Sequence, residues 1–111
     1  LTNSPPALVA AQLENAGIST FFEKQLSVDS VRAFKPSQKV YEFAAQELSE
    51  TAGDLWLIAA HNWDTSGALA SGWNAAFISR PSMQLSRLDQ QPQVVGPSLV
   101  EVADQLIQQL G

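Results

Sequence analysis

Hydrophobic positions recur at helical spacing in three segments of the chain. Ser4 and two prolines precede an apolar stripe that stops at Gly17, which predicts a helix near the first residue with Ser4 as its N-cap. A second helix is predicted over residues 37–48, before a breaker at residues 51–54. Pro97 and Ser98 open a third helix. The residues expected on its buried side are Leu99, Val102, Ala103, Leu106, Ile107 and Leu110.

Short apolar runs between these helices predict strands. Residues 55–60 form a continuous apolar run, as in a central parallel strand that helices cover on both faces. Further strands are predicted over residues 74–78 and 94–95, with a short helix over residues 64–71 closed by Gly72 and a polar surface loop over residues 83–93. This alternation predicts an α/β fold with a mostly parallel sheet, whose chemistry lies at the carboxyl ends of the strands.

Length and composition allow one small domain. Of the 111 residues 45% are hydrophobic, so we expect a single core and no second domain. Eleven acidic and six basic residues give a net charge of −5, and the scattered Lys and Arg form no stripe for a nucleic acid. Cysteine is absent, which excludes thiolate catalysis and disulfides. No apolar run approaches the roughly 20 residues that span a bilayer, so we expect a cytoplasmic protein with no membrane partner.

The first residues suggest that part of the fold lies upstream. Leu1, Thr2 and Asn3 look like the last residue of a strand and its exit loop, yet no strand residues precede them. We therefore expect residues 1–111 to be the C-terminal part of a larger fold. Such a part would expose the apolar surface that its missing strand covers.

Two of the loops at predicted strand ends carry a hydroxyl, an amide and an ammonium group. Thr2 and Asn3, with the backbone N–H groups of a helix start, could accept an anion, although an ordinary N-cap has the same composition. Lys35 precedes Pro36 and is therefore held extended, which could aim its ammonium into a site; the alternative is a solvated surface lysine. Tyr41 follows six residues later, where an amphipathic core tyrosine is the alternative.

The third loop leaves the apolar run of residues 55–60 and places four polar or aromatic groups in a row. They are His61, Asn62, Trp63 and Asp64. Taken singly, each has a structural explanation: a hydrogen-bonded loop histidine, a turn former, a core indole and a helix N-cap. A lone histidine without cysteine or a carboxylate pair is a poor zinc site, so we expect no metal here.

The three loops together resemble the haloacid dehalogenase (HAD) superfamily. The segments LTNSP, SVDSVRAFKPSQKVY and LWLIAAHNWDTSGALASGW are similar, in this order, to motifs two, three and four of its type II branch, the L-2-haloacid dehalogenases. The similarity extends over essentially the whole chain. It implies a Rossmann-like HAD core with a parallel sheet flanked by helices, in which the first strand and the helical cap lie outside this chain.

The resemblance also implies a role for each residue that matches a motif. Thr2 matches the hydroxyl beside the nucleophile, and Asn3 the amide that holds the substrate or the leaving halide. Lys35 matches the lysine that neutralises the nucleophilic carboxylate, and Asp64 the acid that positions this lysine and orients the hydrolytic water. Tyr41 matches a tyrosine nearby, and Trp63 an apolar wall.

This chain departs from the family pattern in two ways. The usual Ser-Ser-Asn-x-Trp-Asp is replaced by residues 59–64, AAHNWD, so that both serines are lost and His61 stands in place of the asparagine, with His61 or Asn62 near the water. The nucleophilic aspartate and the cap arginine lie upstream of residue 1. We therefore expect this chain to be inactive without the N-terminal portion of the same protein.

The resemblance implies an (S)-2-haloacid dehalogenase that hydrolyses short 2-haloacids through an aspartyl ester, needs no cofactor and forms a homodimer. A HAD-type phosphatase is one alternative, but it needs carboxylate ligands for Mg²⁺ where this chain has Ala59 and Ala60. A non-catalytic HAD-like interaction domain is the other. We expect Lys35, as an exposed lysine of the site, to matter more for chemistry than for packing.

Overall fold

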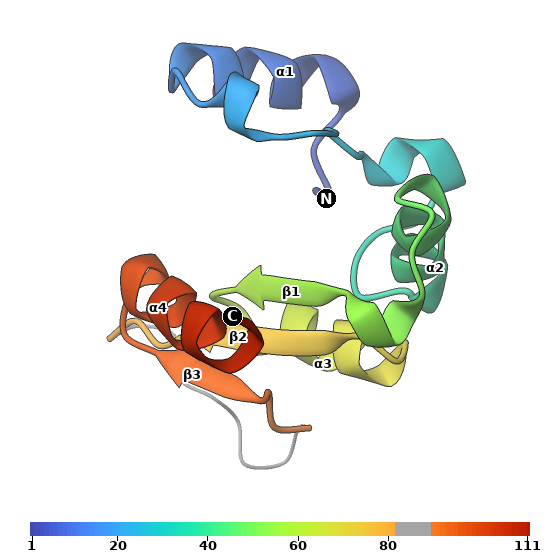
Figure 1. Ribbon diagram of the computed structural model, residues 1–111. Coiled ribbons are helices and arrows are strands. Elements are labelled where there is room, and N and C mark those ends of the chain that lie inside the picture. The colour runs from blue at the N-terminus through green and yellow to red at the C-terminus, as the bar shows by residue number, and fades with distance from the viewer. Residues whose placement is uncertain (82–89) are drawn as a thin grey trace.

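The computed structural model describes residues 1–81 and 90–111, and a parallel three-stranded sheet lies at its centre (Figure 1). The strands are β1 (Trp56–Ala59), β2 (Asn74–Ile78) and β3 (Val94–Gly96), in the order β1-β2-β3. Both pairs are parallel, with Trp56 opposite Asn74 and Ala76 opposite Val94. The predicted α/β class and the three predicted strands are therefore confirmed. Most of the predicted loop over residues 83–93 lies outside the described residues.

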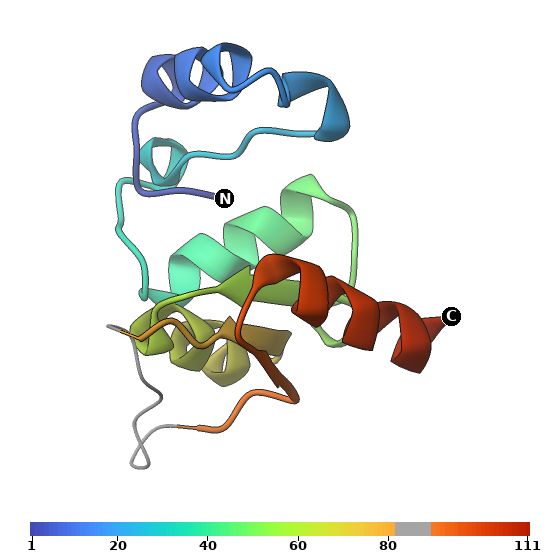
Figure 2. The ribbon, with the colours of Figure 1, turned by 90° about the vertical axis from the view of Figure 1, so that its left-hand side faces the viewer.

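The described residues contain four α-helices: α1 (Pro6–Asn15), α2 (Gln38–Glu47), α3 (Asn62–Ala70) and α4 (Leu99–Leu110). The helices α2, α3 and α4 lie around the sheet, whereas α1 lies apart from it (Figures 1 and 2). Single 3-10 turns, η1 (Ser19–Phe21), η2 (Val28–Val31) and η3 (Ala52–Asp54), connect the remaining elements. In the described part of the chain, no helix combines the length and the apolarity needed to cross a membrane.

Two predicted helix starts were wrong. Pro5, and not Ser4, is the N-cap of α1, because Ser4 is held in the preceding loop: its N–H donates to Thr2 Oγ1 and its carbonyl accepts from Ser27 Oγ. The short helix predicted over residues 64–71 begins at Asn62 with His61 as the N-cap, so Asp64 lies inside the first turn of α3. A carboxylate there still complements the positive end of the helix dipole.

Two clusters of buried side chains cover the opposite faces of the sheet, because successive strand residues point to opposite sides. On one face, Leu57 packs with Tyr41 and Ala44 of α2 and Ala68 of α3. On the other face, β2 and β3 residues pack against α4, and this cluster consists of Ala76, Ile78, Val94, Val102 and Leu106. The core thus needs α2 and α3 on one side and α4 on the other.

The first residues form a second, smaller piece of parallel pairing. Thr2 N–H donates to Leu26 O at 3.0 Å and Val28 N–H to Thr2 O at 3.0 Å, so Thr2 bridges Ser27 in parallel. This pairing is an isolated bridge outside the named strands, and it lies at Thr2, one residue after the predicted strand end at Leu1. In both views of the ribbon the N-terminus lies between α1 and the rest of the chain (Figures 1 and 2).

The prediction that β1 is central and covered on both faces was wrong for this chain. Among the described residues β1 pairs only with β2, so it is an edge of the three-stranded sheet. Ile58 is 40% exposed and lines a cavity beside this edge strand. A continuous apolar run therefore marks a surface that this chain leaves partly uncovered.

The buried side of α4 is narrower than the sequence pattern predicts. Val102 and Leu106 are buried, Ala103 is half-buried, and Leu99, Ile107 and Leu110 are exposed. A three-stranded sheet contacts only one stripe of this helix, so the remaining apolar positions face outward. The predicted start is confirmed, since Ser98 Oγ accepts from Glu101 N–H as an N-cap.

The packing of α4 predicts unequal effects for two identical substitutions. Val102→Ala should lower the free energy of unfolding by about 2 kcal/mol, because it removes two buried methyl groups and leaves a cavity. Val102 is 0% exposed, whereas Val100 on the same helix is 70% exposed, so Val100→Ala should change stability by less than about 0.5 kcal/mol. Urea unfolding of the two variants measures the difference, and equal effects would contradict this packing.

Candidate active site

A buried ion pair joins the second and third loops. Lys35, two residues before the N-cap of α2, places Nζ 2.8 Å from Oδ2 of Asp64, which lies in the first turn of α3. The side chains are 9% and 8% exposed. The structure therefore excludes a solvated surface position for Lys35 and corrects the expectation of an exposed lysine. Removing either charge would leave the other buried and unpaired, which is strongly destabilising.

Tyr41 holds the other oxygen of the same carboxylate. Its hydroxyl donates to Asp64 Oδ1 at 2.6 Å and also lies 3.2 Å from the Asp64 backbone oxygen. The ring is fully buried and meets Trp73 edge to face at 5.8 Å. Burial, together with the hydrogen bond to Asp64 and its negative charge, raises the pKa of the Tyr41 hydroxyl. Asp64 is thus held from two sides, by an ammonium and by a phenol.

The first loop is tied to the second through Asn3. Its Oδ1 accepts a hydrogen bond from the backbone N–H of Lys35 at 2.9 Å, across a separation of 32 residues. This bond fixes the orientation of the Asn3 amide beside the lysine. Thr2 Oγ1 accepts from Ser4 N–H at 3.1 Å, which closes the loop that carries both side chains. The structure therefore brings all three predicted loops to one place.

His61 and Trp63 lie at the exposed rim next to this network. Their rings are 5.3 Å apart and tilted by 32°, and Trp63 is 43% exposed, so Trp63 is not a core residue. Neither side chain is hydrogen-bonded to Lys35 or Asp64 within the described chain. Asn62 opens α3, and its carbonyl accepts from Thr65 Oγ1 at 3.1 Å. His61 and Trp63 thus border the site, and no described hydrogen bond links their side chains to Lys35 or Asp64.

Sequence reasoning did not identify Ser27, whose side chain is hydrogen-bonded to the first loop at Ser4. Ser27 is buried, donates to Ser4 O at 2.7 Å and accepts from Asp29 N–H at 3.2 Å. The available signal was a serine two residues before an aspartate at the start of a short helical turn, where such a side chain caps the backbone. The hydrogen bond to Ser4 joins residues 23 positions apart in the sequence, and no local sequence pattern predicts it.

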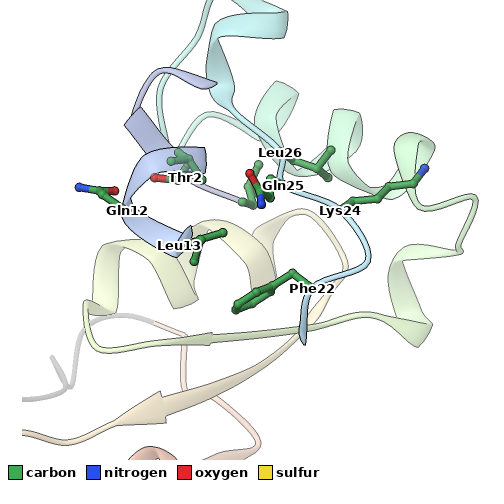
Figure 3. A pocket seen from close by; sticks show the side chains of 9 residues that line it. Thr2, Gln12, Leu13, Phe22, Lys24, Gln25 and Leu26 are labelled. Atoms are coloured by element: carbon green, nitrogen blue, oxygen red, sulfur yellow. The ribbon is translucent and has the colours of Figure 1, made fainter. Parts of the chain in front are cut away.

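Two cavities lie beside the first residues. One, of about 360 Å³, has Lys35 in its wall and separates Leu1 and Leu26 from Trp56 and Ile58 of β1. The other, of about 220 Å³, lies under α1 between Leu13, Phe22 and the extended segment from Lys24 to Leu26 (Figure 3). Only the larger cavity contacts a residue of the ion-pair network, so the smaller one is not assigned to the site.

The described residues offer no ready metal site. In residues 1–81 and 90–111, no three His, Asp or Glu side chains gather as metal ligands would. Residue 59 ends β1 and residue 60 follows it, and both are alanines, whose side chains supply no ligand atom. The chemistry that this arrangement can perform is electrostatic: Asp64 holds the Lys35 ammonium in a fixed position, and Lys35 lines the larger cavity.

The chain is similar in sequence to known dehalogenases. The chain is 32% identical over 92 residues to an (S)-2-haloacid dehalogenase of Pseudomonas sp. (strain YL), with 83% of this chain and 40% of that protein covered. It is 30% identical over 97 residues to haloacetate dehalogenase H-2 of Moraxella sp. (strain B), with 87% and 43% covered. The chain therefore spans less than half the length of these relatives. No family model matches it.

A solved structure shares the fold over the whole chain. The L-2-haloacid dehalogenase of Xanthobacter autotrophicus, with chloropropionic acid covalently bound, superposes with a TM-score of 0.92. The sequence identity is 23%, and the match covers 100% of this chain and 54% of that one. This similarity establishes a HAD-like arrangement of the strands and helices.

The contact between Tyr41 and Asp64 predicts a change in alkaline stability. Because the pKa of Tyr41 is raised in the folded chain, the unfolded chain loses this proton first, from about pH 10 upward. The contribution of Tyr41 to stability is therefore present below that pH and is lost as the pH rises. Urea unfolding between pH 8 and pH 11 should give a steeper decline for the wild type than for Tyr41→Phe, by at most about 1.4 kcal/mol per pH unit. Parallel curves would contradict the prediction.

Proposed function

The chain belongs to the haloacid dehalogenase family, and on this basis we propose that it forms part of an (S)-2-haloacid dehalogenase. Such an enzyme hydrolyses the carbon–halogen bond of a short 2-haloacid and yields a 2-hydroxy acid. The observation that carries the proposal is the buried Lys35–Asp64 pair at 2.8 Å, which lies beside Thr2 and Asn3. A structural ion pair alone does not explain why three separate loops converge on it.

The reaction that fits this site is a displacement followed by ester hydrolysis. A carboxylate oxygen from the N-terminal portion attacks C2 of the substrate, and the halide leaves with the electron pair of the broken bond. Water then adds to the carbonyl carbon of the resulting ester and gives up a proton. The 2-hydroxy acid is released and the carboxylate is regenerated. The first step needs an ionised carboxylate and the second a positioned water, and both requirements are electrostatic.

Each residue of the network has a role in this scheme. Lys35 supplies the positive charge that keeps the nucleophilic carboxylate ionised, and Asp64 holds the ammonium in place with help from Tyr41. Thr2 lies beside the nucleophile, and Asn3 binds the substrate or the departing halide. His61 or Asn62 positions the water, and the exposed face of Trp63 forms an apolar wall of the substrate site.

The nucleophile comes, in this proposal, from a strand in the N-terminal portion of the same protein. Two parallel edges face the 360 Å³ cavity: the free side of β1 and the segment of Leu1 and Thr2. Most of the wall is apolar, with Leu1, Leu26 and Ile58 among its residues, as the space for a buried strand should be; Lys24 and Lys35 are its charged residues. Both edges run towards the ion pair at their carboxyl ends, so a parallel strand between them would end beside Lys35.

This arrangement also makes β1 a central strand, as the sequence pattern predicts. It treats residues 1–111 as the C-terminal part of one HAD-like core domain. The homodimer implied by the resemblance and the cytoplasmic location expected from the composition stay predictions.

The first measurement is halide release. The chain joined to its N-terminal portion, supplied with racemic 2-chloropropionate, should release chloride from only one enantiomer, and excess chelator should not change the rate. The chain alone should release none above a control without protein, because it lacks the nucleophile. Absence of chloride release by the folded joined protein would overturn the proposal. Magnesium-dependent release of phosphate from an aryl phosphate would instead favour the phosphatase.

Lys35 is the residue whose loss should abolish turnover. Lys35→Met keeps the length of the side chain but removes the charge, and should lower kcat by about 1,000-fold or more, since an uncompensated nucleophile loses its electrostatic support. Lys39→Met is the matched control, because Lys39 is exposed on α2 and should leave the rate unchanged. Thermal unfolding of both variants checks the folded fraction, and equal rates for the two would refute the role of Lys35.

A further inference from the structure

Gly67 lies where α3 approaches α2 most closely. A Cβ at this position would be 2.7 Å from Tyr41 Oη, 2.8 Å from Pro36 Cβ and 2.9 Å from Tyr41 Cε2. Real Cβ atoms essentially never come within 3.0 Å of such neighbours. By contrast, a Cβ at Gly53 would meet nothing within 4 Å. The approach of the two helices at Gly67 therefore depends on the absence of a side chain.

The atoms that crowd Gly67 belong to the candidate active site. The Tyr41 hydroxyl is the donor that holds Asp64 Oδ1 at 2.6 Å. Pro36 is bonded directly to Lys35, whose ammonium holds the other carboxylate oxygen at 2.8 Å. Asp64 itself lies one helical turn before Gly67, on the same side of α3. One close contact thus sets the distance of Asp64 from both of its partners.

We infer that Gly67 is a positioning residue for the reaction, acting through Tyr41 and Pro36 to fix the Lys35–Asp64–Tyr41 geometry. The inference rests on the proposed function. A methyl group at residue 67 must move these neighbours by about 0.5 Å or more to reach ordinary contact, near 3.4 Å. A shift of that size lengthens or breaks both short bonds to Asp64. Displacements of about 1 Å in an active site cost on the order of 100-fold in rate.

Helix propensity makes the opposite prediction. In the interior of a helix, alanine is favoured over glycine, so Gly67→Ala would be neutral or stabilising if only the backbone of α3 mattered. Gly67 is buried, and its conformation lies outside the left-handed region that requires glycine. Close packing against Tyr41 and Pro36 is therefore the reason for glycine here.

The kinetic test compares Gly67→Ala, Gly53→Ala, Tyr41→Phe and the double variant Gly67→Ala/Tyr41→Phe in the protein joined to its N-terminal portion. Gly67→Ala should lower kcat for chloride release by about 10- to 100-fold with KM changed less than about threefold, whereas Gly53→Ala should match the wild type. The double variant should be no slower than the slower single variant, because both changes remove the same support. A normal kcat in Gly67→Ala, or losses that multiply, would overturn the inference.

A second readout does not require activity, and it separates this inference from the proposed function. The chain contains one tyrosine, so incorporation of 3-fluorotyrosine gives a single ¹⁹F resonance from residue 41. In the 111-residue chain, Gly67→Ala should move this resonance towards its position in Asp64→Asn, which removes the carboxylate, and Gly53→Ala should leave it in place. An unmoved resonance in folded Gly67→Ala would overturn the inference even if the wild type releases chloride. A moved resonance would support it even if no chloride is released.

A variant that fails to fold is also informative. If Gly67→Ala is unfolded by circular dichroism, the pair Gly67→Ala/Tyr41→Leu should fold, because leucine lacks the hydroxyl and the outer ring carbon that the new methyl group meets. Folding of the pair would show that contact with Tyr41 limits residue 67. Failure of the pair as well would overturn the inference.

Discussion

The buried carboxylate of Asp64 is the feature on which the rest of the site depends. Its side chain is 8% exposed, and an ionised group in that environment is stable only when it is paired and hydrogen-bonded. Lys35 supplies the opposite charge and Tyr41 the hydrogen bond, one to each oxygen. Because these partners come from either side of the start of α2, the position of α2 against α3 is fixed by electrostatics as well as by apolar packing.

Polar contacts explain why the three loops meet. The loops after Thr2 and after Ala59 follow two separate pieces of parallel pairing, and in each piece the loop leaves from the carboxyl end. The bond from the Lys35 N–H to Asn3 then connects the first loop to the ion pair. The two pieces of parallel pairing, Thr2 with Ser27 and the sheet β1-β2-β3, share no strand, so polar contacts in the site hold the loops of the two pieces together.

The sequence pattern predicted the secondary structure correctly where the local signal and the packing agree. Residues 74–78 form β2 as predicted, and α4 begins after Ser98, because a short apolar run and a helix cap are local properties. The pattern was insufficient for Ile107 and for the edge position of β1, since burial depends on which elements are present to cover a residue. The Lys35–Asp64 pair spans 29 residues, and no spacing rule predicts it; only the combined resemblance of the three loops to one family brought these residues together beforehand.

The remaining apolar surface is best understood together with the polar site. Ile58 is exposed on β1, and the wall of the larger cavity includes Leu1, Leu26 and Lys35. In the proposed arrangement, a strand placed between these edges would bury the apolar wall. The same strand would bring its carboxyl end to Lys35, so one element would complete both the core and the site. The hydrophobic gain would then stabilise an electrostatic arrangement that costs free energy to hold away from water. The ion pair does not depend on such a strand, since Tyr41 already holds Asp64 within the described chain.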